Sequence, residues 1–290
     1  MSIDVTILGT ASGMPVKHRY GQTIVLTYRQ AVPDSGQAGM NNTCQTCHTY
    51  HYLLDVGDGA SSLLARHDFD HREIAAIFIS HMHADHHAGL AQVIKTCMHL
   101  KRKKPLTILA PAEGLAALQN YLRASYLCEP FLGYPLHWVS ADQLGKVMAL
   151  PGNLTIRTYF NQHMNWFKTK LQKTGAPHDF SFESYSAVLA FPHLRIAYSG
   201  NLNGPQGIHE MADYAEPCDL LIAELAHVDP YELGRFLHGR EIGHTIITHI
   251  NSKWDGYSEA DIIKRVLEGA EHQPLSLAVA SDGYTYSIDI

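Results

Sequence analysis

The sequence predicts an α/β fold in which β-sheets are covered by helices. Short apolar segments with strand character alternate with longer segments that carry the apolar spacing of helices. The composition agrees, because 46% of the residues are hydrophobic and 17% are charged, a balance that supports a sizeable core and excludes a disordered chain. At 290 residues the length suits one or two domains, and we expect residues 1–290 to form a single domain.

The expected elements follow from this alternation along the chain. The expected strands cover residues 5–8, 23–26, 50–54, 77–79, 106–109, 154–160, 185–191, 195–198, 220–223, 245–248, 275–279 and 285–288. The expected helices cover residues 60–67, 88–99, 114–126, 231–237 and 258–267. Three segments break the rhythm and are expected to be irregular: residues 31–49, 129–143 and 165–183.

Charge and cysteine usage limit the class of protein. The net charge is −6, so no overall basic field points to nucleic acid. The N-terminus has no basic leader and enters a strand at once, and no apolar run is long enough to span a bilayer, so we expect a cytoplasmic protein. The five cysteines fit that location, since their number is odd and their spacing shows no disulfide framework.

Residues 81–86 read His-Met-His-Ala-Asp-His and form the densest group of metal-ligand side chains in the chain. They follow a short apolar run and precede helical spacing, so we expect them on a strand-to-helix loop. In an extended loop His81 and His83 point the same way and can bind one ion, while Asp85 and His86 reach a second position. Surface or core histidines are the ordinary alternative, but four such groups at this spacing favour a metal site.

This order of residues resembles the signature of the metallo-β-lactamase-fold hydrolases. Residues 8–15 and 54–59 resemble the opening and the acidic turn of the ribonuclease Z and phosphodiesterase branch of these enzymes. Residues 197–201 and 246–249 resemble its later site-bearing strands. The resemblance covers nearly the whole chain and implies a four-layer αβ/βα sandwich, the metallo-β-lactamase fold, with two sheets face to face and helices outside.

The resemblance implies further metal ligands. His163, which follows the strand expected at residues 154–160, lies at the third metal-binding element and would complete the site of His81 and His83. His249 matches the last histidine of the family. His244, at the other end of the same strand, is the alternative candidate, which we expect to be structural.

Asn201 stands where the family usually has an aspartate that bridges two ions. A neutral amide is a weaker ligand, so we expect the second ion to be held loosely, although Asn201 could also be a simple turn residue. Asp55 would accept a hydrogen bond from a ligand histidine. Asp58 could instead cap the helix expected from residue 60.

The implied chemistry is metal-assisted hydrolysis with one or two zinc ions, or manganese or iron in their place. A metal-bound water would lose its proton, and the resulting metal-bound hydroxide would attack a small phosphodiester. Asp85 would orient that water or accept its proton. His227, which follows Glu224, is the candidate proton donor to the leaving group, with an ordinary surface histidine as the alternative. Hydrolysis of a carboxylic ester or lactone is one alternative. A non-catalytic metal-binding protein with a second site degraded at Asn201 is the other. His83 argues against a redox enzyme, because oxygen-reducing relatives carry glutamate there.

Basic residues indicate the class of substrate. Lys168, Lys170 and Lys173 lie in the segment after His163 and suit a small-molecule anionic substrate, and the apolar residues beside them suggest a wall over the metals. The long basic arm with which ribonuclease Z holds tRNA has no counterpart, so structured RNA is not expected. The basic run at residues 101–104 lies at a helix end, where it complements the helix dipole. A homodimer stays an open alternative.

Residues 44–48 read Cys-Gln-Thr-Cys-His, the spacing of covalent haem attachment. We reject haem because attachment requires an exported chain and we expect no signal peptide. Cys44, Cys47, His48 and His51 leave two alternatives open, a small structural zinc site or free thiols in a loop.

Overall fold

The computed structural model describes residues 2–31, 47–142 and 146–289. Their strands form two seven-stranded sheets, in the orders β14-β1-β2-β3-β4-β5-β6 and β13-β12-β11-β10-β9-β8-β7. The first sheet contains β1 (Ser2–Gly9), β2 (Thr23–Ala31), β3 (Cys47–Val56), β4 (Ile74–Phe78), β5 (Leu106–Ala110), β6 (Leu136–Ser140) and β14 (Tyr284–Asp289). The second contains β7 (Met148–Leu150), β8 (Leu154–Phe160), β9 (Tyr185–Phe191), β10 (Leu194–Tyr198), β11 (Cys218–Leu225), β12 (Ile242–Ile250) and β13 (Leu277–Val279).

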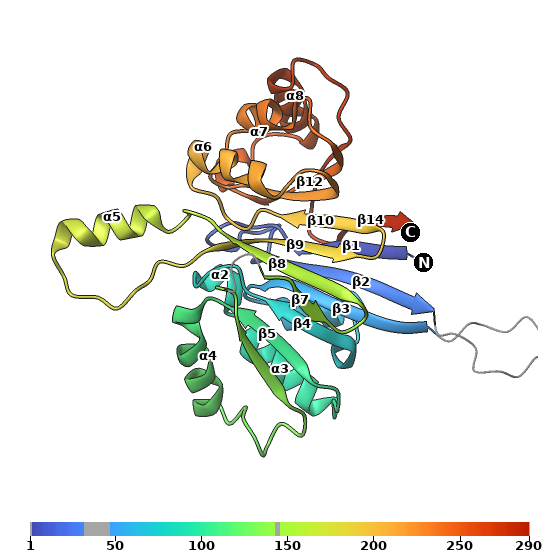
Figure 1. Cartoon of the computed structure of the whole chain (residues 1–290), viewed down its shortest axis with the longest axis vertical. Coiled ribbons are helices and arrows are strands. Elements are labelled where there is room, and N and C mark those ends of the chain that lie inside the picture. The colour runs from blue at the N-terminus through green and yellow to red at the C-terminus, as the bar shows by residue number, and fades with distance from the viewer. Residues whose placement is uncertain (1, 32–46, 143–145, 290) are drawn as a thin grey trace, which may run out of the picture.

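Helices cover the outer faces of the two sheets (Figure 1). The helices are α1 (Ala60–Arg66), α2 (Ala84–His87), α3 (Leu90–His99), α4 (Ala112–Ala124), α5 (Asn165–Thr174), α6 (Gly204–Gly207), α7 (Pro230–Leu237) and α8 (Glu259–Gly269). Short 3₁₀ turns cover His71–Glu73, Ile208–Asp213 and Ser252–Trp254. In Figure 1, α3 and α4 lie on one side of the sheets and α7 and α8 on the other, which confirms the four-layer αβ/βα sandwich.

The core has three apolar layers, as this architecture requires. Neighbouring residues of β3 show why: Tyr52 and Leu54 join the cluster between the sheets, whereas Leu53 joins the cluster beneath the helices. A third cluster lies beneath α7 and α8 and includes Leu233. Each sheet therefore buries both faces. That residues 1–290 form a single domain stays a prediction.

Two of the segments expected to be irregular contain regular structure. Residues 129–143 include β6, an edge strand that pairs in parallel with β5, so that prediction was wrong there. Residues 165–183 begin with α5, in which no residue is buried. A helix without a buried face leaves no apolar stripe in the sequence, which is why the prediction failed. Of residues 31–49, Ala31 ends β2 and residues 47–49 begin β3, and the remainder lies outside the described residues.

The predicted site residues gather where strands end at one edge of the sandwich. His81 follows β4, His163 follows β8, Asn201 follows β10 and His249 is the penultimate residue of β12. The two sheets are hydrogen-bonded at this edge, since the amide of Tyr185 donates to the carbonyl of Ser80 over 3.0 Å. Side chains from both sheets can therefore meet there. No helix of the described ranges combines the length and hydropathy needed to cross a membrane.

Arg102, from the basic run at residues 101–104, has a structural role that the sequence did not indicate. It is 2% exposed and donates hydrogen bonds to four backbone carbonyls, those of His71, Arg72, Lys104 and Pro105. A buried guanidinium with its donors satisfied by carbonyls fixes the chain after α3.

Candidate metal centre

Three histidines from both sheets form the first ligand cluster. The ligand nitrogens of His81, His83 and His163 all lie within 4.8 Å of one another. His81 Nε2 is 2.9 Å from His83 Nδ1, and His163 Nε2 is 3.4 Å from the same atom. His81 and His83 come from the turn between β4 and α2, whereas His163 comes from the end of β8. The structure thus brings together the three residues predicted for the first site.

Asp85, His86 and His249 form a second cluster, again with ligand atoms within 4.8 Å of one another. Asp85 Oδ2 lies 3.3 Å from His86 Nε2 and 3.8 Å from His249 Nε2. The clusters are adjacent, because the ring centroids of His81 and His86 are 4.1 Å apart. The helical turn α2 makes this possible by directing His83 to one cluster and the next two ligand-type residues to the other.

The site histidines are held in the form that binds metal. Burial lowers the pKa of His81 well below its ordinary value, and it lowers the pKa of His163 and of His249 to about 3. Burial opposes ionisation of Asp85, but the close approach and charge of His86 outweigh that cost and lower the pKa of Asp85. Neutral imidazoles and an ionised carboxylate are the ligand forms of these groups.

His86 behaves differently because it lies between two carboxylates. Burial disfavours its charged form, yet Asp55 and Asp85 together raise the pKa of His86 to about 9. The surroundings of His86 therefore stabilise a positive charge. A metal cation bound there would take the place of that proton.

Buried polar atoms without partners support a metal at the second cluster. Among the described residues, His86 Nε2 and both ring nitrogens of His249 are buried and make no hydrogen bond. Asn201 Oδ1 is also buried and makes no hydrogen bond. An unpartnered buried polar atom is destabilising, and a cation would supply the missing partner. The nitrogen and oxygen donors suit zinc or a similar first-row ion.

Asp55 orients the second cluster through a dense set of hydrogen bonds. Its carboxylate accepts from the Ser80 amide over 2.7 Å, from Ser80 Oγ over 2.9 Å and from His86 Nδ1 over 2.7 Å. Tyr198 OH, on the second sheet, donates to the same carboxylate over 2.6 Å. These contacts leave His86 Nε2 free to bind an ion. Sequence reasoning indicated Asp55 but missed Tyr198, because a tyrosine in an apolar strand carries no signal of its own.

The backbone at the site is unusual at two positions. Asp55 and His249 both adopt left-handed φ angles, 58° and 51°. Such conformations are uncommon for these residues and persist where the surrounding contacts enforce them. Gly57 permits a close approach beside them, since a Cβ there would lie 2.5 Å from the carbonyl oxygen of Asp85. The turn that carries the ligands therefore packs directly against the end of β3.

Glu224 holds His227 beside the first cluster. Glu224 is 1% exposed, and its Oε1 lies 3.1 Å from His227 Nδ1. The ring of His227 is 4.7 Å from that of His163, and its side chain is 36% exposed. Burial lowers the pKa of His227, but the hydrogen bond and charge of Glu224 outweigh it and the pKa is raised. A protonated imidazole at the mouth of the site suits the role of proton donor.

Contacts resolve two alternatives that the sequence left open. His244 is structural, as expected, since its Nδ1 lies 2.7 Å from Ser276 Oγ and its ring stacks on Tyr286 at 4.1 Å. The capping role considered for Asp58 is wrong, because α1 has Gly59 at its N-cap and no side-chain cap.

The strand β3 separates the residues considered for a structural zinc. Successive side chains of a strand point to opposite faces, so His48 faces away from Cys47 and His51. Cys47 and His51 share a face but are four residues apart, roughly 13 Å along a strand. His51 is buried against Phe69, with ring centroids at 5.2 Å. Cys47, His48 and His51 therefore cannot all bind one ion. Cys44, the fourth residue considered, lies outside the described residues.

A cavity of about 820 Å³ opens next to the first cluster. His83 is part of its lining, and the ring of Phe167 on α5 lies 4.9 Å from the ring of His83. Met82, Met164 and Phe182 make further parts of the wall apolar. Of the three lysines predicted to face the substrate, Lys170 lines this cavity, and its Nζ also lies 4.7 Å from the centre of the Trp166 ring.

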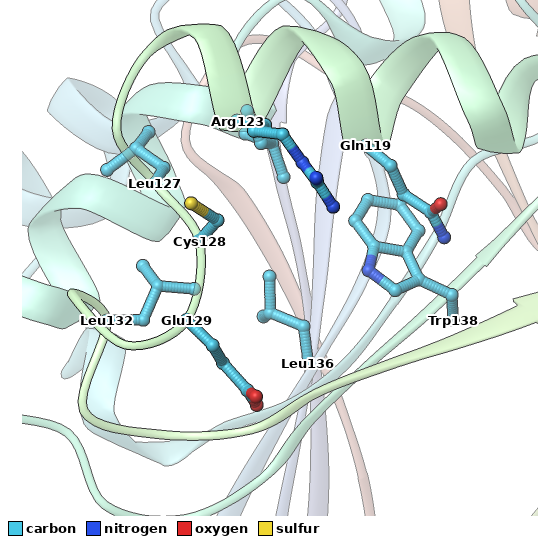
Figure 2. A pocket seen from close by; sticks show the side chains of 9 residues that line it. Gln119, Arg123, Leu127, Cys128, Glu129, Leu132, Leu136 and Trp138 are labelled. Atoms are coloured by element: carbon cyan, nitrogen blue, oxygen red, sulfur yellow. The ribbon is translucent and has the colours of Figure 1, made fainter.

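A second cavity, of about 420 Å³, lies between α4 and β6 (Figure 2). Arg123 extends from α4 toward Gln119 and Trp138, and Glu129 lies on the opposite side. None of the cluster residues lines it. It is therefore separate from the candidate metal centre.

The fold and the paired ligand clusters define a metallo-β-lactamase-fold protein of the ribonuclease Z and phosphodiesterase-like branch. The family model described as Anti-Pycsar protein Apyc1 matches residues 35–225, more than half of the chain, and the chain belongs to this family.

Sequence relatives and solved structures agree with this placement. Ribonuclease Z of Staphylococcus epidermidis is 33% identical over 143 residues, which cover 49% of this chain and 40% of that protein. The chain thus matches less than half the length of that relative. Ribonuclease Z of Marinobacter nauticus is 23% identical over 99% of this chain and 97% of its own.

Two structures show the same fold across the whole chain. The metallo-β-lactamase-fold protein YhfI from Bacillus subtilis has a TM-score of 0.69 at 16% identity, with 99% of this chain and 100% of that chain covered. A diphosphatase of the PhnP family has a TM-score of 0.63 at 15% identity, with 99% and 98% covered. At these identities the likeness establishes the fold.

Proposed function

We propose that this chain is a metal-dependent hydrolase that cleaves a small anionic phosphodiester. The observation that carries the proposal is the pair of adjacent three-residue clusters at the edge of the sandwich. Two ions held by adjacent clusters would suit a phosphoryl group, whose negative charge they would offset. The names of the relatives, ribonuclease Z and diphosphatase, are consistent with chemistry at phosphorus.

The ligand residues would form two separate metal sites. His81, His83 and His163 would hold the first ion, and Asp85, His86 and His249 the second. Bound zinc, or manganese or iron in its place, would supply Lewis-acid activation of water and of the phosphoryl oxygens.

Asp85 would accept a proton and His227 would donate one during the reaction. Asp85 Oδ2 accepts a hydrogen bond from the amide of Gly13 over 2.8 Å, which orients the carboxylate. His227 has its Nδ1 held by Glu224, so Nε2 is the atom from which a proton would pass to the leaving oxygen. The partial exposure of His227 allows it to recover that proton from solvent.

Asn201 favours a second candidate function. A neutral amide in place of a bridging carboxylate leaves less negative charge to offset two cations, so the second ion would bind weakly. If that site stays empty under all conditions, the chain would be a metal-binding protein without catalysis.

The test combines elemental analysis with turnover of bis(p-nitrophenyl) phosphate. We expect the purified protein to carry metal and to release nitrophenolate, and we expect His83→Ala to lose most of both. His193→Ala is the matched control, since this exposed histidine lies in the turn between β9 and β10, away from the clusters. p-Nitrophenyl acetate and a precursor tRNA test the ester and RNA alternatives. Full metal content with no turnover of any phosphodiester would refute the proposal.

A further inference from the structure

Glu113 binds three consecutive backbone amides of a segment far from it in the sequence. Its Oε2 accepts from the amides of Ser181 and Phe182 over 2.7 and 3.0 Å, and its Oε1 accepts from the amide of Glu183 over 2.9 Å. Successive amides that converge in this way form an anion-binding concavity. Here the anion is a side chain of the protein, the second residue of α4.

Glu183 in turn accepts a hydrogen bond from the first turn of α4. Its Oε2 accepts from the amide of Ala112, the first residue of α4, over 2.7 Å and from Tyr185 OH over 3.1 Å. The N-cap residue of α4 is Pro111, which provides no side-chain cap, so Glu183 satisfies a helix amide that would otherwise be free. We call this exchange between Glu113 and Glu183 the carboxylate latch.

The carboxylate latch holds a strained residue in place. Phe182 has a φ angle of 60°, a left-handed conformation that is costly for an aromatic residue. Its side chain is buried and lies 5.3 Å from the ring of His178 and 6.0 Å from that of Phe180. The amide bonds to Glu113 run on both sides of this residue and so enforce its conformation.

This segment is one wall of the cavity that adjoins His83. Ser181 and Phe182 line the cavity together with Glu113 and the neighbouring Gly114, and Phe167 of α5 is another part of the lining. In Figure 1, α5 and the coil that follows it extend away from the two sheets, so the return of the chain to α4 is what gives the cavity this side. The position of the wall relative to His83 therefore depends on the carboxylate latch.

We propose that the carboxylate latch is a specificity device: Glu113 positions Ser181 and Phe182 so that the cavity receives an apolar, ring-sized substituent of the phosphodiester. The substrate class that follows is a phosphodiester with at least one bulky apolar group. This rests on the proposed function. Glu113 is a positioning residue, because its carboxylate is already occupied by backbone amides and acts through the wall that they hold.

The test measures binding of two phosphonates to the zinc-loaded protein. Phenylphosphonate and methylphosphonate offer the metals the same group, and neither is hydrolysed, so their ratio reports on the cavity alone. We expect wild type to bind phenylphosphonate more tightly than methylphosphonate. Glu113→Gln turns an amide donor toward backbone donors, so it should reduce the affinity for phenylphosphonate by about tenfold and the affinity for methylphosphonate by less than about twofold. Glu232→Gln, at a half-exposed glutamate on α7, is the control and should match wild type.

A second readout is hydrogen exchange at the amides of Ser181, Phe182 and Glu183, which should be protected in wild type and exchange at least about tenfold faster in Glu113→Gln. Equal exchange in both forms, or the wild-type phosphonate ratio in Glu113→Gln, would overturn the proposal. So would a wild type without preference for phenylphosphonate. If Glu113→Gln lost the preference for phenylphosphonate but wild type hydrolysed no phosphodiester, the role of the carboxylate latch would be supported and only the proposed function would be refuted.

Discussion

Replacing Tyr198 by phenylalanine removes a hydroxyl that joins the two sheets at the candidate metal centre. The hydroxyl is fully buried and donates to Asp55 over 2.6 Å, and Asp55 in turn orients His86. A hydrogen bond to a charged group contributes about 1.5–3 kcal/mol. Asp55 keeps the two donors of Ser80 and the donor of His86, so we expect a loss of about 2 kcal/mol in the free energy of unfolding, or about 5 °C in Tm.

The same change should also weaken the second metal. A looser Asp55 holds His86 less firmly, and losses of this kind reduce metal affinity by about tenfold or more. Denaturant unfolding of the metal-free protein and a zinc titration measure the two effects separately. Tyr214→Phe is the matched control, since Tyr214 is equally buried but donates to the neutral Ser186 Oγ over 2.9 Å. If Tyr198→Phe kept the stability and second-site affinity of wild type, the role given to Asp55 would be wrong.

Three further predictions address other parts of the account. Asn201→Asp restores a bridging charge and should tighten the second metal by at least about tenfold in a zinc titration, and equal affinities would mean that residue 201 does not face the metals. Gly57→Ala should destabilise the protein by about 1–3 kcal/mol or more in thermal unfolding, because its Cβ would lie 2.5 Å from the carbonyl oxygen of Asp85, and an unchanged Tm would contradict the close packing. Burial lowers the pKa of His51 to about 4, so stability should be full above pH 6.5 and fall by about 3 kcal/mol as pH drops toward 4; a His51→Gln variant should lack this slope, whereas an equal slope in both would assign it elsewhere. The charged and titratable groups around His51 are Glu73, Arg29, Asp70 and His71.

The sequence predicted which side chains converge at the candidate site because metal-ligand residues are concentrated within it. Residues 81–86 hold four ligand-type groups, and His163 and His249 follow strands whose apolar pattern is plain. The fold followed for a similar reason, since buried strands and helices on both sheets have strong local patterns. What a resemblance implied for these residues agrees with their convergence in two clusters.

The parts that the sequence did not predict depend on contacts between distant residues. Tyr198 and Asp55 are separated by 143 positions, and Glu113 and Ser181 by 68, so no local pattern marks either pair. The helix α5 was missed because none of its residues is buried, and β6 was missed because its flanking glycine and prolines resemble a loop.

The paired clusters should hold two ions side by side. Anomalous X-ray diffraction at the zinc edge, on crystals grown with excess zinc, would locate them. We expect one peak about 2.0–2.2 Å from the ligand nitrogens of His81, His83 and His163, and a second, weaker peak at a similar distance from the ligand atoms of Asp85, His86 and His249. No peak at either cluster, or zinc bound only elsewhere on the chain, would contradict the account.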